Sequence, residues 1–322
     1  MRVSNTTIHE LDQWLNQKSK IDRIDLAPFD LPNQSLHILR EDVLLAEASG
    51  NKLRKLLPNL KKAAQSGVRR VVTFGGAYSN HIAATAAAGQ KFGFETVGVI
   101  RGEELAMKAN ENPTLRKAAE CGMTLVFVGR TDYKRREDPD YLSALQERFA
   151  PCVLIPEGGS NELAIQGVAK MASLLPEKFK VLCTPIGTGG TMAGLLSGAQ
   201  LGQEVWGFSA LKGVDFESQL KHYGDGISRT IFKDYHFGGY AKANNELIDF
   251  INNFNAQTGI ALDPLYTGKM VFGLLDLIRK NRKINAQEVL VIHTGGLQGI
   301  EGFNAANSGL TNIVYDKKSQ HI

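Results

Sequence analysis

Short apolar runs rich in β-branched residues alternate with amphipathic segments from residue 69 onward. The length and composition of these runs predict strands at 70–74, 96–100, 123–128, 153–155, 181–185, 205–209 and 289–293. Elsewhere in this part of the chain, apolar positions recur at helical spacing, which predicts helices at 80–92, 114–121, 141–149, 165–175, 190–201, 245–255, 269–279 and 297–307. The alternation predicts an α/β fold in which parallel-rich sheets are flanked by helices.

The N-terminal part of the chain shows a different pattern. Residues 36–39 and 43–46 are apolar and predict a hairpin-like pair of strands, and 51–65 predict a helix interrupted only by Pro58. The length of 322 residues exceeds that of a usual single domain. We therefore expect two domains, as follows: a larger one of residues 1–46 plus 158–322, and a smaller one of residues 47–157.

Composition and charge narrow the possible partners. The net charge of +4 is small, and basic residues are interleaved with acidic ones, as in Tyr133-Lys-Arg-Arg-Glu-Asp138, so we expect no nucleic-acid partner. A run of about 18 apolar residues and a signal peptide are both lacking, which predicts a cytoplasmic protein without a membrane partner. The three cysteines lie in or beside apolar runs, which predicts buried thiols.

Three glycine-bearing turns each follow a predicted strand. They are Gly75-Gly-Ala-Tyr-Ser-Asn80, Gly187-Thr-Gly-Gly-Thr191 and Thr294-Gly-Gly296. Parallel sheets bind ligands beyond the carboxyl ends of their strands, so three such turns predict one shared crevice.

The middle turn carries the clearest chemical signal, because it leads from a predicted strand into a predicted helix. Glycines expose backbone N–H groups, and the helix dipole adds partial positive charge, so a phosphate fits there. Thr188 and Thr191 add hydroxyl donors. Taken alone, the turn could also serve only tight packing of strand on helix.

A nicotinamide dinucleotide is disfavoured at this turn. The third glycine of G-x-G-x-x-G is replaced by Met192, and the next predicted strand ends in Phe208-Ser-Ala-Leu, without the acidic residue that binds ribose. The sequence around these glycines also lacks a Walker-type phosphate loop.

Two lysines begin the helix predicted at 51–65. Lys52 and Lys55 are three residues apart and share a helix face, where two ammonium groups disfavour each other's protonation and leave one amine available as a nucleophile. The sequence has no paired histidine ligands, no C-x-x-C and no G-x-S-x-G, so we expect no metal. A phosphate turn and a reactive lysine favour Schiff-base chemistry with a phosphorylated aldehyde.

Five motifs in register carry a family resemblance. They are Gly50-Asn-Lys-Leu-Arg-Lys55, Gly75-Gly-Ala-Tyr-Ser-Asn-His81, Gly187-Thr-Gly-Gly-Thr191, Leu262-Asp-Pro-Leu-Tyr-Thr-Gly-Lys269 and His293-Thr-Gly-Gly296. Over roughly residues 35 to 300 the chain resembles the 1-aminocyclopropane-1-carboxylate deaminase and D-cysteine desulfhydrase family.

The resemblance implies the tryptophan-synthase-like fold (fold type II) of pyridoxal-phosphate enzymes, which often form homodimers. It implies that Lys52 forms the Schiff base, that Asn80 binds the 3′-oxygen of the cofactor, and that Thr294 faces the pyridine nitrogen. The implied phosphate cradle consists of Gly187, Thr188, Gly189, Gly190 and Thr191. The implied substrate and catalytic side chains, beside Lys52, are Tyr78, Ser79, Asn80 and Tyr266.

The sequence departs from the family at Tyr78, where glutamine is usual, and this leaves the substrate open. We expect β-elimination from D-cysteine or a related β-substituted D-amino acid, giving pyruvate and ammonia. The alternatives are deamination of 1-aminocyclopropane-1-carboxylate and, in another class, a non-catalytic protein that binds a phosphate ligand.

Overall fold

A computed structural model of the chain describes residues 15–16, 18–44, 50–281 and 283–315. The chain divides into two compact units. Unit 1 consists of Met1–Asn16 and Lys52–Gly167, and unit 2 of Gln17–Asn51 and Val168–Ile322. The predicted larger domain (1–46 plus 158–322) and the predicted closing of the smaller domain (47–157) over a substrate stay predictions.

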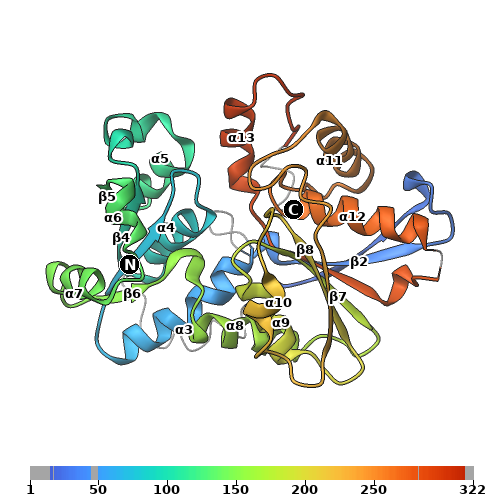
Figure 1. The fold of residues 1–322 in the computed structure, drawn as a ribbon, viewed down its shortest axis with the longest axis horizontal. Coiled ribbons are helices and arrows are strands. Elements are labelled where there is room, and N and C mark those ends of the chain that lie inside the picture. Colours follow the sequence, from blue (N-terminus) through green and yellow to red (C-terminus); the bar gives the residue numbers. More distant parts are fainter. Residues whose placement is uncertain (1–14, 17, 45–49, 282, 316–322) are drawn as a thin grey trace. The chain divides into compact units, whose positions relative to one another are not determined.

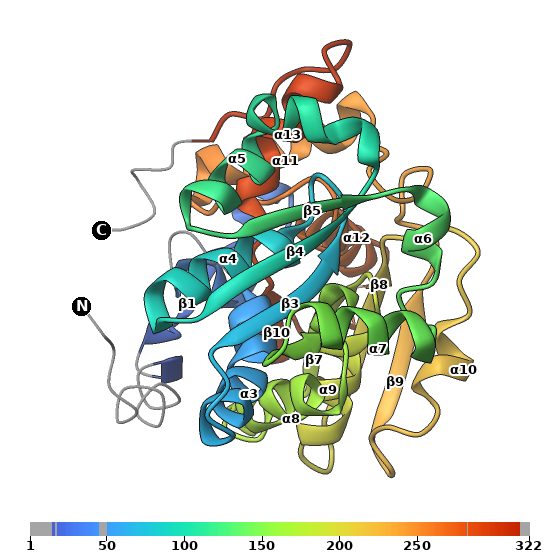
Figure 2. The ribbon, with the colours of Figure 1, turned by 90° about the vertical axis from the view of Figure 1, so that its left-hand side faces the viewer.

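Unit 1 contains a parallel four-stranded sheet in the order β5-β4-β3-β6, in which β3, β4 and β5 run side by side in Figure 2. Its strands are β3 (Arg70–Gly75), β4 (Glu95–Arg101), β5 (Thr124–Val128) and β6 (Val153–Ile155). Its helices are α4 (Asn80–Phe92), α5 (Pro113–Glu120), α6 (Arg130–Lys134) and α7 (Pro139–Arg148). Two further helices, α3 (Asn51–Gln65) and α8 (Glu162–Ala172), cross the boundary between the units. One face of the sheet buries apolar side chains of β3 and β4, among them Val72, Phe74, Val97 and Val99.

Unit 2 contains a six-stranded sheet in the order β1-β2-β10-β7-β8-β9. Its strands are β1 (Ile21–Asp25), β2 (Ser35–Arg40), β7 (Val181–Ile186), β8 (Glu204–Ser209), β9 (Ser228–Phe232) and β10 (Val289–His293). Its helices are α9 (Gly190–Gly198), α10 (Phe216–Leu220), α11 (Asn245–Thr258), α12 (Thr267–Lys280) and α13 (Ile300–Ala306). Only the β1–β2 pair is antiparallel. Helices α11 and α12 lie against each other (Figure 1), and α12 also packs on β7 and β8.

The α/β class is confirmed, and every strand and helix predicted after residue 69 is present, with ends shifted by a few residues. The predicted segment 297–307 begins as a 3₁₀ turn, Leu297–Gly299, and continues as α13. Helix α3 runs through Pro58 without ending there.

The prediction of a hairpin-like pair of strands at 36–39 and 43–46 was wrong. Residues 36–39 belong to β2, which pairs with β1, and Glu41–Val43 forms a 3₁₀ turn, while residues 45–46 lie outside the described part of the chain. Strands β1 and β9 escaped the prediction because polar and charged residues interrupt their apolar positions, and both are edge strands. An edge strand can leave one face in water, and in β1 only Ile24 is buried, so the apolar signal is weak.

Two further expectations concern the cysteines and membrane-spanning helices. Cys121, Cys152 and Cys183 are buried and form no disulfide with one another, and burial raises the pKa of the Cys183 thiol well above its usual value. In the residues that the structure describes, every helix is too short or too polar to cross a membrane.

Candidate active site

The turn Gly187–Thr191 joins β7, near the middle of the sheet of unit 2, to α9. Gly189 has φ 80°, a left-handed conformation that favours glycine. Within the described residues, no side chain caps the first N–H groups of α9. The Thr191 hydroxyl accepts a hydrogen bond of 2.5 Å from Asn51 Nδ2, which leaves its own hydrogen for another acceptor. Uncapped amides, helix dipole and hydroxyl together fit a phosphate.

Tyr266 lies against the first glycine of this turn. A Cβ on Gly187 would be 2.9 Å from Tyr266 Cε1, so only glycine allows the ring to approach so closely. The Asp263 carboxylate holds the backbone at Tyr266, because it accepts hydrogen bonds from the N–H groups of Leu265, Tyr266 and Thr267 at 2.9, 3.0 and 2.8 Å. Asp263 thus caps α12 and fixes the residue that precedes it.

The turn after β10 contacts the beginning of α3. The Thr294 carbonyl accepts a hydrogen bond of 3.3 Å from the Asn51 N–H. Gly50 has φ 90°, and a Cβ at this position would be 1.9 Å from the Thr294 oxygen. Asn51 therefore bonds both to the Thr294 turn and, through its side chain, to Thr191. The next residue in the chain is Lys52.

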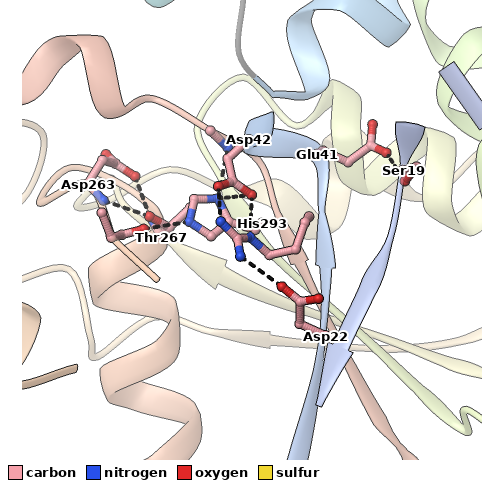
Figure 3. A network of polar contacts seen from close by, with 10 residues as sticks. Ser19, Asp22, Glu41, Asp42, Asp263, Thr267 and His293 are labelled. Atoms are coloured by element: carbon pink, nitrogen blue, oxygen red, sulfur yellow. Dashed lines mark hydrogen bonds and ion pairs between the residues drawn. The ribbon is translucent and has the colours of Figure 1, made fainter. Parts of the chain in front are cut away.

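A buried polar network supports the Thr294 turn from within unit 2 (Figure 3). The Arg40 guanidinium donates two hydrogen bonds to the Asp42 carboxylate, at 2.9 and 2.8 Å. His293 Nδ1 lies 3.5 Å from Asp42 and 3.2 Å from the Gly295 nitrogen, so it accepts from the Gly295 N–H when the ring is neutral and faces Asp42 as a cation when the ring is protonated. Burial by itself raises the pKa of Asp42, but His293 and Arg40 outweigh burial and lower it. The network holds the residues on both sides of Thr294.

In unit 1 three nitrogen bases lie close together. Burial lowers the pKa of Lys52 to about 8, because its amine is surrounded by protein although the side chain keeps some exposed surface. Burial, and then the charge of Lys52, lower the pKa of Lys55 well below its ordinary value. Burial, with smaller contributions from both lysines, lowers the pKa of His81 to about 3. His81 Nε2 donates to the Thr73 hydroxyl at 2.8 Å, because that hydroxyl itself donates to the Ile155 carbonyl.

This cluster refines the expectation of two mutually repelling ammonium groups. Lys55 is almost fully buried, and burial lowers its pKa more than the charge of Lys52 does. Burial is also the cause of the lowered pKa of Lys52, about 8, so near neutral pH Lys52 exchanges its proton readily.

The turn between β3 and α4 carries the predicted substrate residues of unit 1. Ser79 caps α4, and its Oγ accepts a hydrogen bond of 3.3 Å from the Ile82 N–H. Asn80 begins the helix directly before His81, whose pKa responds to both lysines. Tyr78 is 46% exposed. Ser79 and Asn80 thus belong to the same unit as Lys52.

A family model described as "Pyridoxal-phosphate dependent enzyme" matches residues 26–295. The chain belongs to this family. It is therefore a pyridoxal-phosphate enzyme of the tryptophan-synthase-like fold (fold type II), as the sequence predicted.

Within this pyridoxal-phosphate family, three similarities are informative. A putative 1-aminocyclopropane-1-carboxylate deaminase of Thermotoga maritima is 32% identical over 83% of this chain and 90% of its own length. A bifunctional D-cysteine desulfhydrase/1-aminocyclopropane-1-carboxylate deaminase, mitochondrial, of Arabidopsis thaliana is 31% identical over 84% of this chain and 74% of its own. The crystal structure of an ACC deaminase homologue has a TM-score of 0.75 and 25% identity, covering 91% of this chain and 93% of its own.

The sequence-predicted site residues of this pyridoxal-phosphate enzyme are divided between the units. Lys52, Tyr78, Ser79 and Asn80 belong to unit 1, whereas 187–191, Tyr266 and Thr294 belong to unit 2. Their predicted common crevice and their roles stay predictions. Among the described residues, no group of three or more His, Cys, Asp or Glu side chains could hold a metal ion.

Three supporting residues were not among the sequence predictions, namely Asn51, Asp263 and Asp42. The first two lie within quoted motifs, so their signal was the motif itself: Asn51 directly precedes Lys52, and Asp263 stands three residues before Tyr266. Asp42 had no local signal, because its partner His293 is remote in sequence.

Proposed function

We propose that this enzyme releases pyruvate and ammonia, together with hydrogen sulfide, from D-cysteine, or carries out the same elimination on a related β-substituted D-amino acid. The observation that carries the proposal is the position of Asn51. Its side chain bonds to Thr191 in the turn that fits a phosphate, and its peptide bond leads to the low-pKa amine of Lys52. The names of the relatives, a deaminase and a bifunctional desulfhydrase, favour a small amino acid as substrate.

Pyridoxal phosphate, when bound, withdraws electrons from Cα of an attached amino acid and makes its proton acidic. In the proposed arrangement Lys52 would hold the cofactor until the amine of the substrate displaces it, and the freed Nζ would then take the Cα proton. Residues 187–191 bind the phosphate, Asn80 binds the 3′-oxygen, and Thr294 faces the pyridine nitrogen. Ser79 binds the substrate carboxylate or assists proton transfer, and Tyr266 lies near the substrate.

Elimination is favoured over opening of a cyclopropane ring because it is the less demanding reaction. It requires a base and a leaving group on Cβ, whereas ring opening also requires an acid or nucleophile at the ring carbons. Tyr78, in the position of the usual glutamine, changes the shape of the substrate side. The runner-up is deamination of 1-aminocyclopropane-1-carboxylate to 2-oxobutanoate and ammonia.

An assay of keto-acid release tests this choice across D- and L-amino acids and 1-aminocyclopropane-1-carboxylate. We expect pyruvate from D-cysteine and little 2-oxobutanoate. Tyr78→Gln should shift the ratio of kcat/KM values between substrates by about tenfold, since pocket contacts change discrimination by about 1 to 3 kcal/mol. The absorbance of the bound cofactor should not change. Efficient turnover of the cyclopropane substrate with no pyruvate from any D-amino acid would establish the runner-up.

The apo-protein should attach pyridoxal phosphate faster as pH rises, with a midpoint near the Lys52 pKa of about 8. The reason is that only the neutral amine attacks the aldehyde, and the amine is protonated below its pKa. Lys55→Met should leave this midpoint within about half a unit, because burial, and not the charge of Lys55, lowers the pKa of Lys52. Stopped-flow absorbance across pH measures both midpoints. A midpoint near 10.5, the ordinary lysine value, would contradict the assignment.

The setting of the reaction is also part of the proposal. We infer a cytoplasmic homodimer with a small amino acid as its only substrate class, in which residues 47–157 close over that substrate. The alternative from another functional class is a protein that binds a phosphate ligand without catalysis, and such a protein requires no covalently attached cofactor. An absorbance band that survives gel filtration and disappears with borohydride separates the two.

A further inference from the structure

Lys269 is a buried cation to which the proposed function gives no role. It lies in the first turn of α12, and its side chain is almost completely buried. Its Nζ donates hydrogen bonds of 2.8 Å to the carbonyl oxygens of His236 and Gly239. Both acceptors are backbone carbonyls rather than carboxylates, and burial lowers the pKa of Lys269 to about 8.

The segment that supplies these carbonyls has an unusual backbone. Phe237, Gly238, Gly239 and Ala241 have φ values of 52°, 93°, 116° and 56°. Phenylalanine and alanine rarely adopt such angles, so surrounding contacts must hold the loop 236–241 in place.

The ammonium adds to bonds that the loop makes within itself. The His236 carbonyl also accepts from the Gly239 N–H at 3.0 Å, and the Gly239 carbonyl accepts from the Lys242 N–H at 3.2 Å. Each carbonyl thus uses one lone pair within the loop and the other for Lys269. Two carbonyl oxygens that converge on one point create a negative potential, which a cation satisfies and an apolar side chain does not.

Helix α12 holds the loop along one face. Phe272 packs edge-on against Phe237, with ring centroids 5.1 Å apart, and Asp276 accepts a 2.6 Å hydrogen bond from the Tyr235 hydroxyl. Positions 269, 272 and 276 share a helix face because they are spaced by three and four residues. Lys269 is the point of this face nearest to the N-terminus of α12, where Tyr266 lies.

The loop ends beside that same N-terminus. The ring of Tyr240 lies 6.2 Å from the ring of Tyr266, which in turn lies against Gly187. All of these residues belong to unit 2. A loop that moved away from α12 would therefore take Tyr240 away from Tyr266.

We propose that the ammonium of Lys269 is a tethered cation in a backbone carbonyl site, and that it positions loop 236–241 so that Tyr240 stands beside Tyr266. Removing the side chain leaves a cation site that a free ammonium ion can fill. Lys269 acts through the loop and is a positioning residue. The effect on substrate binding rests on the proposed function, which puts Tyr266 near the substrate, whereas the cation site does not.

Chemical rescue of Lys269→Ala tests the cation site. In the holoenzyme, the variant should be cleaved by chymotrypsin after Phe237 and Tyr240 about tenfold faster than the wild type. Ammonium chloride at about 0.1 M should restore protection, and tetramethylammonium chloride, too large for the site, should not. Lys242→Met is the matched control, because Lys242 is an exposed lysine of the same segment. It should be cleaved at the wild-type rate.

Kinetics of the same variants test positioning. Lys269→Ala should raise KM for D-cysteine about tenfold, with kcat within about threefold and cofactor absorbance unchanged, and ammonium should restore KM. Wild type at the same ammonium concentration controls for inhibition by the product. Lys269→Met should show the same rise in KM, and ammonium should not reverse it, because the methionine side chain fills the cation site.

The proposal would be overturned if Lys269→Ala, without ammonium, resisted chymotrypsin as well as the wild type does. It would also be overturned if ammonium did not restore protection, or if tetramethylammonium restored protection equally well. If Lys269→Ala does not fold, Lys269→Gln replaces it, since its amide keeps N–H donors without the charge. Faster cleavage then supports the cation site, and wild-type cleavage overturns it. If the wild type consumes no amino acid, the proposed function fails, but the proteolysis still decides on Lys269.

Discussion

Replacing Lys52 by alanine is expected to lower kcat by about 10³-fold or more, because one side chain supplies both the covalent attachment and the base at Cα. Lys55 cannot substitute, since it is buried one turn further along α3. The variant should keep its secondary structure and bind pyridoxal phosphate only noncovalently. Activity and cofactor retention after gel filtration measure the two losses.

Lys62→Ala is the matched control for this experiment. Lys62 is an exposed lysine of the same helix, and its removal should leave kcat and cofactor retention unchanged. If Lys52→Ala and Lys62→Ala behaved alike, Lys52 would have no part in the chemistry.

Gly50→Ala is expected to be the most damaging conservative substitution next to the site. The added Cβ would lie 1.9 Å from the Thr294 oxygen, and the backbone has φ 90°. The added Cβ and the Thr294 carbonyl oxygen are both attached directly to the backbone, and no side-chain rotation can separate them. The beginning of α3 or the Thr294 turn must therefore move. Overpacking and left-handed strain together should lower the free energy of unfolding by about 2 to 5 kcal/mol. Cofactor retention should fall as well, because Asn51 bonds to Thr191.

Gly67→Ala provides the comparison, because Gly67 follows the other end of α3 with φ 70° and nothing within 4 Å of an added Cβ. Gly67→Ala should lower the free energy of unfolding only by the backbone strain, about 1 to 2 kcal/mol, and should leave cofactor binding intact. Urea unfolding of both variants, with cofactor titration, separates a local backbone effect from the contact with Thr294. Equal losses in the two variants would show that the Gly50–Thr294 approach is unimportant.

The central strands and the glycine turns were predictable from the sequence because their signals are local. A strand such as β7, with neighbours on both sides, reads as a continuous apolar run, and the turn that follows needs glycine at 189 for its backbone angle. The edge strands β1 and β9 lacked that signal because polar residues interrupt them, whereas the edge strands β5 and β6 are apolar runs and were predicted.

The contacts that organise the site were not predictable in this way. Asn51 and Thr191 are 140 residues apart, and no periodicity says which of two distant polar side chains will meet. Burial was similarly hidden for Lys55. Its spacing from Lys52 predicted charge repulsion, but burial is the larger cause of its lowered pKa.

Borohydride reduction of the wild-type holoenzyme, followed by peptide mapping, identifies the amine that holds pyridoxal phosphate. Reduction fixes the cofactor as a pyridoxyl group on the amine that holds it. We expect this group on Lys52, in the peptide that begins α3. A pyridoxyl group on Lys55 or Lys269, or on no peptide of this chain, would contradict this assignment.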